Sequence, residues 1–186
     1  MFMEKETLNA DFRNLSKEEL LGLLEDASLN WLAHDGLWFQ VVEENFGIEN
    51  ASLCNQKAIA KYSQIEAKRI MKRLNLPKDG GIPILMRAMK FRMYHLINKQ
   101  EFREVSEKRC VFRMVACRVQ DARRRKGLPD YPCKPVGMEE YRHFAQTIDG
   151  RIKTRCPAVH RTNTPMITGV PGSFTWTKMS ERSFFS

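Results

Sequence analysis

The chain has 186 residues, of which 42% are hydrophobic and 28% are charged. This length suffices for one domain with a buried core, and the hydrophobic content excludes an intrinsically disordered chain. No run approaches 18 apolar residues, and the N-terminus lacks a basic segment followed by an apolar one. We therefore expect neither a membrane span nor a secretory signal, and we expect the protein to be cytoplasmic.

The charge is unevenly distributed along the chain. The 31 Lys and Arg residues exceed the 22 Asp and Glu residues, which gives a net charge of +9. Residues 1–75 carry −3 (nine basic, twelve acidic), whereas residues 76–186 carry +12 (22 basic, ten acidic). The densest basic run, residues 123–126, could contact the phosphates of a nucleic acid. It could also end a helix, where cations oppose the helix dipole and Gly127 is the usual next residue, and this second interpretation is favoured.

Helices are predicted in the first half of the chain. Residues 16–19 form a capping box that starts a helix, and its apolar stripe runs from Leu20 to Phe46, with Gly47 ending it. A second helix is predicted from about Ala51 to Leu74, and a third from Pro83 to about Ile97.

The pattern changes after residue 98. Alternating residues and turn signals predict strands at 100–106, 109–116, 151–155 and 174–178, with helices at 118–126 and 137–148. The expected fold class is α+β: about three N-terminal helices, then a small, mostly antiparallel sheet with helices packed on it. We expect a flexible N-terminus (1–14), a single domain at 15–179 with a helical part (15–97) and a sheet-containing part (98–179), and a frayed tail (180–186).

Polar residues interrupt two of the apolar stripes. His34 and Asp35 fall where the first helix should continue its apolar face, and Glu66 does the same on the second helix. If the two helices pack antiparallel, these three side chains could converge, with His95 nearby. They would then form an acid–base or metal site. The alternative is a hydrogen-bonded core histidine and a surface glutamate, and it is favoured because no two histidines have metal-binding helical spacing.

The five cysteines form no CxxC pair, so we expect reduced thiols and no disulfide framework. Cys117, Cys133 and Cys156 lie at predicted element boundaries, and each has a cationic neighbour in sequence. Positive charge favours the thiolate, which nucleophilic or metal-binding chemistry requires. These three cysteines could meet at one end of the sheet, with His160 as a fourth group, in a thiol site or a divalent metal site such as zinc.

Several segments resemble an uncharacterised family of bacterial and archaeal cytosolic proteins, domain of unknown function 6125. The resemblance covers about residues 15–178 and rests on residues 15–20, 31–39, 117–127, 132–134 and 144–156. That family is in turn distantly similar to L-2-amino-thiazoline-4-carboxylate hydrolase-like proteins, which open a sulfur-containing ring with water. The resemblance thus implies small-molecule thiol or ring-opening chemistry.

The C-terminal part departs from the family pattern. Family members have a Cys–Pro–Pro–Asp–x–His–Pro stretch and then a Cys–Ala–Trp strand. Here Cys156 and Trp176 match the pattern, but Phe174 stands where a cysteine is expected, and a second loop cysteine is missing. A complete four-cysteine metal site is therefore in doubt for this chain.

The first functional hypothesis is a small-molecule-binding protein or hydrolase, with a pocket between the N-terminal helices and the sheet. His34, Asp35, Glu66 and Cys117 are its predicted catalytic residues. Asp149 and Arg151 could anchor a ligand carboxylate beside Trp176, although an ordinary turn with an ion pair also explains the first two. The alternative is a nucleic-acid- or protein-binding module that uses the basic half. A homo-oligomer is compatible with either hypothesis.

Overall fold

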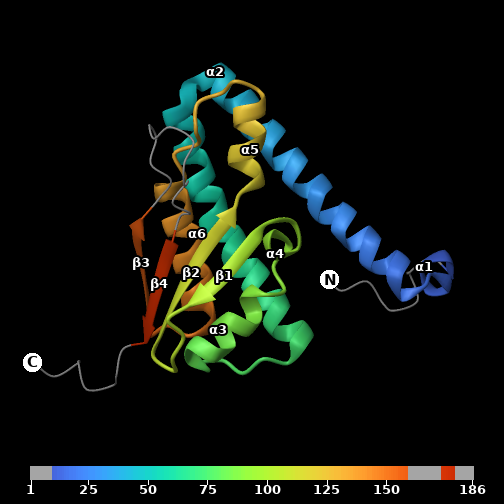
Figure 1. The fold of residues 1–186 in the computed structure, drawn as a ribbon, viewed down its shortest axis with the longest axis vertical. Helices are drawn as coiled ribbons and strands as arrows, with labels where there is room; N and C mark the ends of the chain where they lie inside the picture. The colour runs from blue at the N-terminus through green and yellow to red at the C-terminus, as the bar shows by residue number, and fades with distance from the viewer. Residues whose placement is uncertain (1–9, 159–172, 179–186) are drawn as a thin grey trace, which may run out of the picture.

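The computed structural model of the chain describes residues 10–158 and 173–178. Their order is α1 (Ala10–Asn14), α2 (Lys17–Leu74), α3 (Gly81–Met89), α4 (Met93–Ile97), β1 (Lys99–Arg103), β2 (Arg109–Ala116), α5 (Arg118–Arg125), α6 (Cys133–Ile148), β3 (Ile152–Ala158) and β4 (Ser173–Lys178) (Figure 1). The fold is α+β, as the sequence predicts. Part of the predicted flexible N-terminus forms α1, and the predicted tail 180–186 lies outside the described residues.

Helix α2 is a helical hairpin whose two arms meet at Gly47. The predicted capping box starts it, because the Glu19 amide donates to Ser16 Oγ and the Ser16 amide donates to the Glu19 carboxylate. Gly47 has φ 81° and ψ 159°, a conformation that only glycine adopts easily. We call residues 17–46 the first arm and residues 48–74 the second arm. The rings of Trp31 and Tyr62 stack across them with centroids 5.3 Å apart, so the arms are antiparallel.

The helix predicted at 83–97 is instead two helices. Helix α3 ends at Met89, and α4 begins only after Arg92, whose backbone is extended (φ −74°, ψ 147°). Because of this break, the Arg92 side chain points into the protein, and only 1% of the surface of this residue is exposed. Helix α6 also differs from its prediction, because it starts at Cys133 and accommodates Pro135 in its first turn, where a missing amide costs no helical bond.

The four strands form one antiparallel sheet with the order β1-β2-β4-β3. One face of this sheet packs against α3 and α6 (Figure 1). The pairing of β2 with β4 places Phe112 opposite Phe174 and Cys110 opposite Trp176. Strand β4, at the C-terminal end of the described chain, therefore pairs with β2, which lies much earlier in the sequence.

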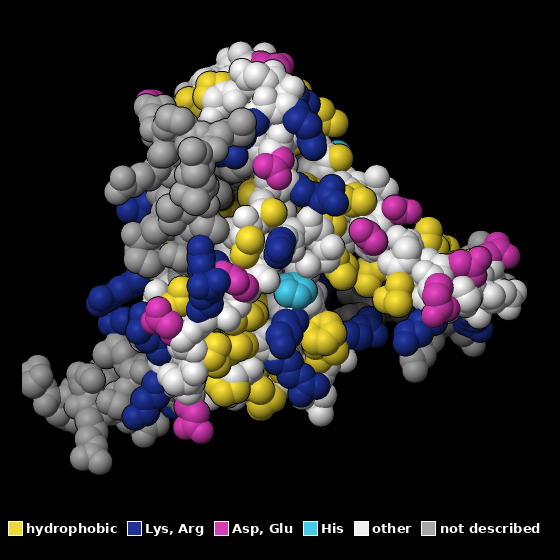
Figure 2. All heavy atoms as spheres, in the orientation of Figure 1, with side chains coloured by type: hydrophobic (Ala, Val, Ile, Leu, Met, Phe, Trp, Pro, Cys, Tyr) yellow, Lys and Arg dark blue, Asp and Glu magenta, His cyan; other side chains and the backbone are white. Residues whose placement is uncertain are grey.

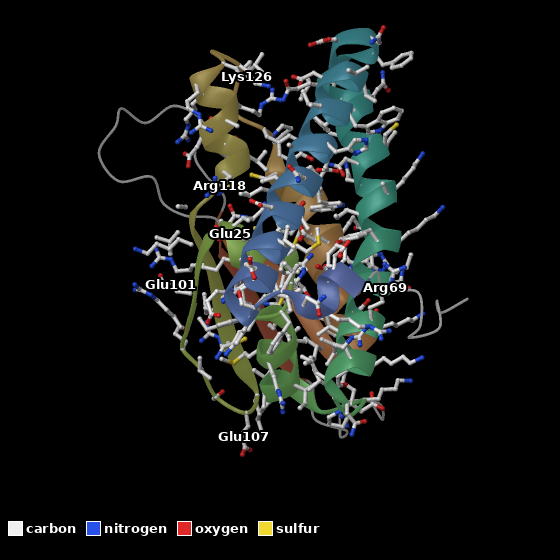
Figure 3. All side chains as sticks on the ribbon, turned by 90° about the vertical axis from the view of Figure 1, so that its right-hand side faces the viewer. Glu25, Arg69, Glu101, Glu107, Arg118 and Lys126 are labelled. Atoms are coloured by element: carbon white, nitrogen blue, oxygen red, sulfur yellow. The ribbon has the colours of Figure 1, made fainter. Side chains whose placement is uncertain are left out.

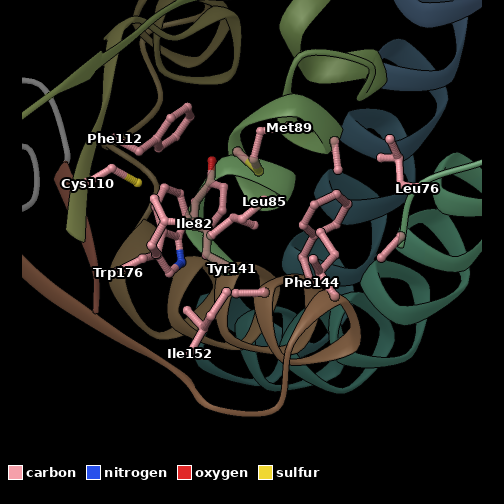
Figure 4. Close-up of a cluster of buried hydrophobic side chains, with 14 residues drawn as sticks. Leu76, Ile82, Leu85, Met89, Cys110, Phe112, Tyr141, Phe144, Ile152 and Trp176 are labelled. Carbon is pink, nitrogen blue, oxygen red and sulfur yellow. The ribbon is translucent and has the colours of Figure 1, made fainter. Parts of the chain in front are cut away.

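The hydrophobic core lies between this sheet, α3, α6 and the second arm of α2. Phe112, Tyr141 and Trp176 form its aromatic centre, with ring centroids between 5.2 and 5.9 Å apart (Figure 4). Burying an aromatic side chain of this size stabilises the fold by roughly 2–3 kcal/mol. None of the helices within the described residues is both long and apolar enough to cross a membrane.

Candidate functional site

A cavity of about 510 Å³ lies where the first arm of α2 passes over α5, α6 and the end of β2. Apolar side chains supply most of its wall: Leu29, Leu32, Ala33, Leu37, Phe39, Ile59, Met114, Val119, Ala122 and Val136. Asn55 and Ile59 of the second arm also line this space, so the turn at Gly47 brings both arms of the hairpin to the cavity. Its volume falls within the range of pockets that hold small organic molecules.

The basic run of α5 fixes that helix to the first arm. Arg123 donates from Nη1 and Nη2 to the two carboxylate oxygens of Glu43, at 2.6 and 2.8 Å. Arg124 pairs with Asp130, and Lys126 donates to Gln40 at 2.9 Å. Figure 3 shows α5 beside the first arm, with labels at its first residue, Arg118, and at Lys126 directly after its last. Three of the four basic side chains of the run thus have partners in the protein.

The end of α5 confirms the helix-end interpretation of the sequence. Gly127 has φ 68° and its amide donates to the Arg124 carbonyl, while the Leu128 amide donates to the Arg123 carbonyl at 2.9 Å. This is the Schellman arrangement of a glycine-capped helix. The cations of the run therefore lie at the negative pole of the helix dipole, as predicted.

A network of polar side chains holds the floor of the cavity. Gln120 donates to the Tyr131 carbonyl at 2.8 Å and to Cys133 Sγ at 3.3 Å, and it accepts from the Tyr131 amide at 2.9 Å. Asn55, on the second arm, donates to the Tyr131 hydroxyl at 3.0 Å. These bonds lock the Tyr131 ring against Phe39, edge to face with centroids 4.9 Å apart. Both rings line the cavity.

Asp35 is an acidic residue of the cavity wall that has no counterion among the described residues. It lines the cavity, and no group of the described residues donates a hydrogen bond to its carboxylate. Burial raises the pKa of Asp35, and the neighbouring His34 opposes the shift. Tyr94, Tyr131 and Glu140 also line the cavity, and the negative charge of Asp35 contributes to the raised pKa of each. Asp35 thus shares the cavity with acidic and phenolic groups, and four cationic residues also line it: Arg118, Arg123, Arg125 and Lys126.

Glu140 connects the cavity to a buried ion cluster. Arg92 donates from Nε to Glu66 at 2.8 Å and pairs through Nη2 with Glu140 at 2.7 Å. The guanidinium also lies over the Phe144 ring, 4.7 Å from its centroid. Burial raises the pKa of Glu140, and Arg92 partly offsets that shift. Glu66 is therefore a structural partner of Arg92, and it does not line the cavity.

The predicted convergence of His34, Asp35 and Glu66 is not observed. The arms are antiparallel as the hypothesis required, but His34 is exposed and outside the cavity lining, while Glu66 points to Arg92. His95 contacts Gln100 through Nδ1 at 3.1 Å. Of the predicted acid–base group, Asp35 alone lines the cavity. Nothing in the sequence distinguishes Arg92 and Glu140 from solvated charges such as the nearby Lys90 and Glu139.

Two of the three boundary cysteines do share a site. Cys117 and Cys133 both line the cavity, whereas Cys156 packs against the hydrophobic core and His160 lies outside the described residues. Within the described part of the chain, no three His, Cys, Asp or Glu residues are arranged to hold a metal ion. The structure thus does not assemble the zinc site considered from the sequence.

The cysteine side chains also differ from the expected thiolates. Burial raises the pKa of Cys117 and of Cys133. At Cys117 this effect is larger than that of the hydrogen bonds from the Val119 and Gln120 amides, which lower the pKa. Cationic neighbours in the sequence do not decide the charge state, because the surrounding apolar wall disfavours the anion more strongly. Burial of both side chains thus opposes the activated thiolate that the sequence neighbours favour.

The predicted carboxylate anchor is a structural turn. Asp149 is fully buried and accepts from the Gly81 amide at 3.1 Å and from Arg151 Nε at 2.9 Å. Arg151 also donates to the Asp79 carbonyl, so it ties the start of β3 to the loop before α3. Trp176 is buried in the core. None of these three residues lines the cavity.

The fold and the cavity define a class of protein: an α+β domain with a mostly apolar cavity beneath a helical hairpin. The chain belongs to the family of unknown function DUF6125, whose sequence profile matches residues 13–169. A comparison with curated proteins finds no match. Among solved structures, a trafficking protein particle complex subunit 3 from Naegleria fowleri, crystallised covalently bound to palmitic acid, is similar at a TM-score of 0.49 and 8% identity. The similarity covers 84% of this chain and 95% of that one.

Proposed function

We propose that the protein binds a small organic molecule with an apolar body and a protonated amine. The apolar walls of the cavity accept the body, and Asp35 accepts the amine. The observation that carries this proposal is the half-buried Asp35 carboxylate, which faces an apolar cavity without a counterion among the described residues.

The aromatic side chains around Asp35 support a cationic group. Phe39, Tyr94 and Tyr131 line the same cavity, and ring faces attract ammonium groups, most strongly when water is excluded. The wall holds four cationic residues, of which Arg123 is bonded to Glu43, Lys126 to Gln40 and Arg118 to the Ile97 carbonyl. None of the four is paired with Asp35 among the described residues. A bound amine would therefore supply the missing counterion.

The ring-opening hydrolysis implied by the distant resemblance to L-2-amino-thiazoline-4-carboxylate hydrolase-like proteins is not part of this proposal. His34 and Glu66, which would have supplied proton transfer, lie outside the cavity, and burial raises the pKa of the Cys117 thiol. The cavity therefore favours the small-molecule-binding part of the sequence-based hypothesis over its hydrolase part. The nucleic-acid alternative loses its main support, because α5 uses its basic run to contact the first arm and the following loop.

Calorimetry with three eight-carbon probes tests the proposal: octylamine, octanol and octanoate. Octylamine should bind most tightly to the wild type at pH 7. The substitution Asp35→Asn should weaken octylamine roughly tenfold or more, because hydrogen bonds to charged groups contribute about 1.5–3 kcal/mol, and should leave octanol within twofold. Tighter binding of octanoate than of octylamine would overturn the assignment of Asp35.

A blocked cavity separates binding inside it from binding elsewhere. Ala122 lines the cavity, so Ala122→Phe should abolish binding of all three probes. Ala116→Phe is the matched control, because Ala116 is exposed on β2 and outside the lining. Circular dichroism should show that both variants are folded. Unchanged octylamine binding by a folded Ala122→Phe variant would place the ligand elsewhere.

A further inference from the structure

The start of the first arm of α2 projects beyond the rest of the molecule. Trp31 marks where this arm meets α4, because its ring contacts Tyr94 edge to face with centroids 5.2 Å apart. Ser28 is the last fully buried residue toward the N-terminus of the arm. Residues 17–27, which we call the overhang, extend past the body in Figure 1. At about 1.5 Å per helical residue, the overhang is roughly 16 Å long.

The overhang is amphipathic, and its apolar side stays about half exposed among the described residues. Its four leucines are between 42% and 53% exposed: Leu20, Leu21, Leu23 and Leu24. At 100° per residue, Leu20, Leu21 and Leu24 fall on the side that carries Ser28 and Trp31. The overhang also holds one lysine and four acids, a net charge of −3. Figure 2 shows hydrophobic and acidic side chains gathered along this arm.

The surface around α4 has the opposite charge. Residues 87–99, which we call the basic shoulder, contain four Lys or Arg residues and no acid. Arg92 is buried with its two carboxylates, but Arg87, Lys90 and Lys99 are exposed. Phe91 and Leu96 of the same segment are 56% and 45% exposed. The shoulder thus combines exposed apolar side chains with uncompensated positive charge.

We propose that the overhang of one copy packs on the basic shoulder of a second copy, and the reverse, in a two-fold symmetric dimer. The leucines would bury Phe91 and Leu96 while the acids approach Lys90 and Arg87. Because each copy carries both surfaces, one symmetric contact covers both exposed apolar groups. Contiguous exposed apolar surface of this kind is unusual in a monomer.

Charge reversal tests the pairing through light scattering after size exclusion and sedimentation equilibrium of the full chain. The wild type should be a dimer at micromolar concentration. Glu18→Lys/Glu25→Lys should reduce dimerisation at least tenfold, and Arg87→Glu/Lys90→Glu should do the same. An equimolar mixture of these two variants should form a heterodimer, because each overhang then meets a shoulder of opposite charge.

Two further variants serve as controls. Leu20→Gln/Leu24→Gln should give a monomer with an unchanged circular dichroism spectrum. Lys57→Glu/Lys61→Glu removes the same charge from the exposed face of the second arm, and it should leave the dimer unchanged. A monomeric wild type, a mixture that does not associate, or a control that dissociates equally would overturn the proposal. Flotation of monomeric wild type with neutral phosphatidylcholine vesicles would also overturn it, and would assign the overhang to a membrane surface.

Discussion

The buried ion cluster of Glu66, Arg92 and Glu140 predicts a large and pH-dependent loss of stability on Arg92→Met. The substitution removes both ion pairs, at 2.8 and 2.7 Å, and leaves two largely buried carboxylates without their cation. It also removes the guanidinium from the face of the Phe144 ring. Breaking one buried pair costs about 3–5 kcal/mol, a large share of the ~5–15 kcal/mol that stabilises a typical domain.

The pH dependence identifies the cause of that loss. Burial already raises the pKa of Glu140 against the opposing effect of Arg92, so removing Arg92 raises it further. A carboxyl whose pKa is higher in the folded than in the unfolded state binds more protons when folded, and stability therefore falls as pH rises above its ordinary pKa. The Arg92→Met variant should thus regain stability relative to wild type as pH falls from 8 to 5.

Urea unfolding followed by circular dichroism at pH 5, 6, 7 and 8 measures this effect. The control replaces the whole cluster with apolar side chains, Glu66→Leu/Arg92→Met/Glu140→Leu, and should recover most of the loss because no buried charge remains unpaired. An Arg92→Met variant within 1 kcal/mol of wild type at pH 8, or a loss that does not change with pH, would refute the assigned role of the cluster.

Three further predictions concern the hairpin, α5 and the cavity. Gly47→Ala should lower the free energy of unfolding in urea by about 1–3 kcal/mol, because Gly47 has a positive φ. Gly22→Ala, in a regular helix with open space around the new methyl group, should instead raise it by roughly 0.5–1 kcal/mol, and equal effects of the two substitutions would contradict the backbone argument. Arg123→Ala should cost about 2–3 kcal/mol because it breaks a bidentate pair at a 4% exposed side chain, and Arg124→Ala, with 52% exposed, should cost less than about 1 kcal/mol. Asp35→Asn should raise the melting temperature at pH 7, because the pKa of Asp35 is raised in the folded state and wild-type stability therefore falls as pH rises. The difference in melting temperature between variant and wild type should vanish below pH ~4, and a difference that does not change with pH would refute this explanation.

Much of the fold follows from local rules in the sequence. The capping box at Ser16, the glycine after α5 and the alternation of β2 each depend on residues that are close in the chain, so the sequence predicts them within a few positions. The break between α3 and α4 does not follow from such rules. It exists because Arg92 turns inward to two carboxylates, one of them 48 residues later in the chain, and nothing local distinguishes Arg92 from the exposed Lys90.

The candidate site was predictable only in part, for the same reason. Asp35 stood out because a polar residue interrupted an apolar stripe, and it does line the cavity. Burial raises the pKa of Cys117, against the thiolate that its sequence neighbours favour, because neighbours in the chain show which charges are near but not how much of the side chain is buried. Tyr94 and Tyr131 gave no signal at all, since an aromatic residue in a loop or a short helix more often belongs to the core.

The first arm of α2 serves both proposed interactions. Residues 29–40 form one wall of the cavity, and the overhang immediately before them would contact a second copy. A helix transmits a tilt along its length, because its backbone hydrogen bonds resist bending within a few turns. Docking of the overhang would therefore set the angle of the arm above α5 and α6, and with it the width of the cavity. Ligand binding and dimerisation would then be coupled, and a ligand that favours one arm angle would favour the dimer that holds it.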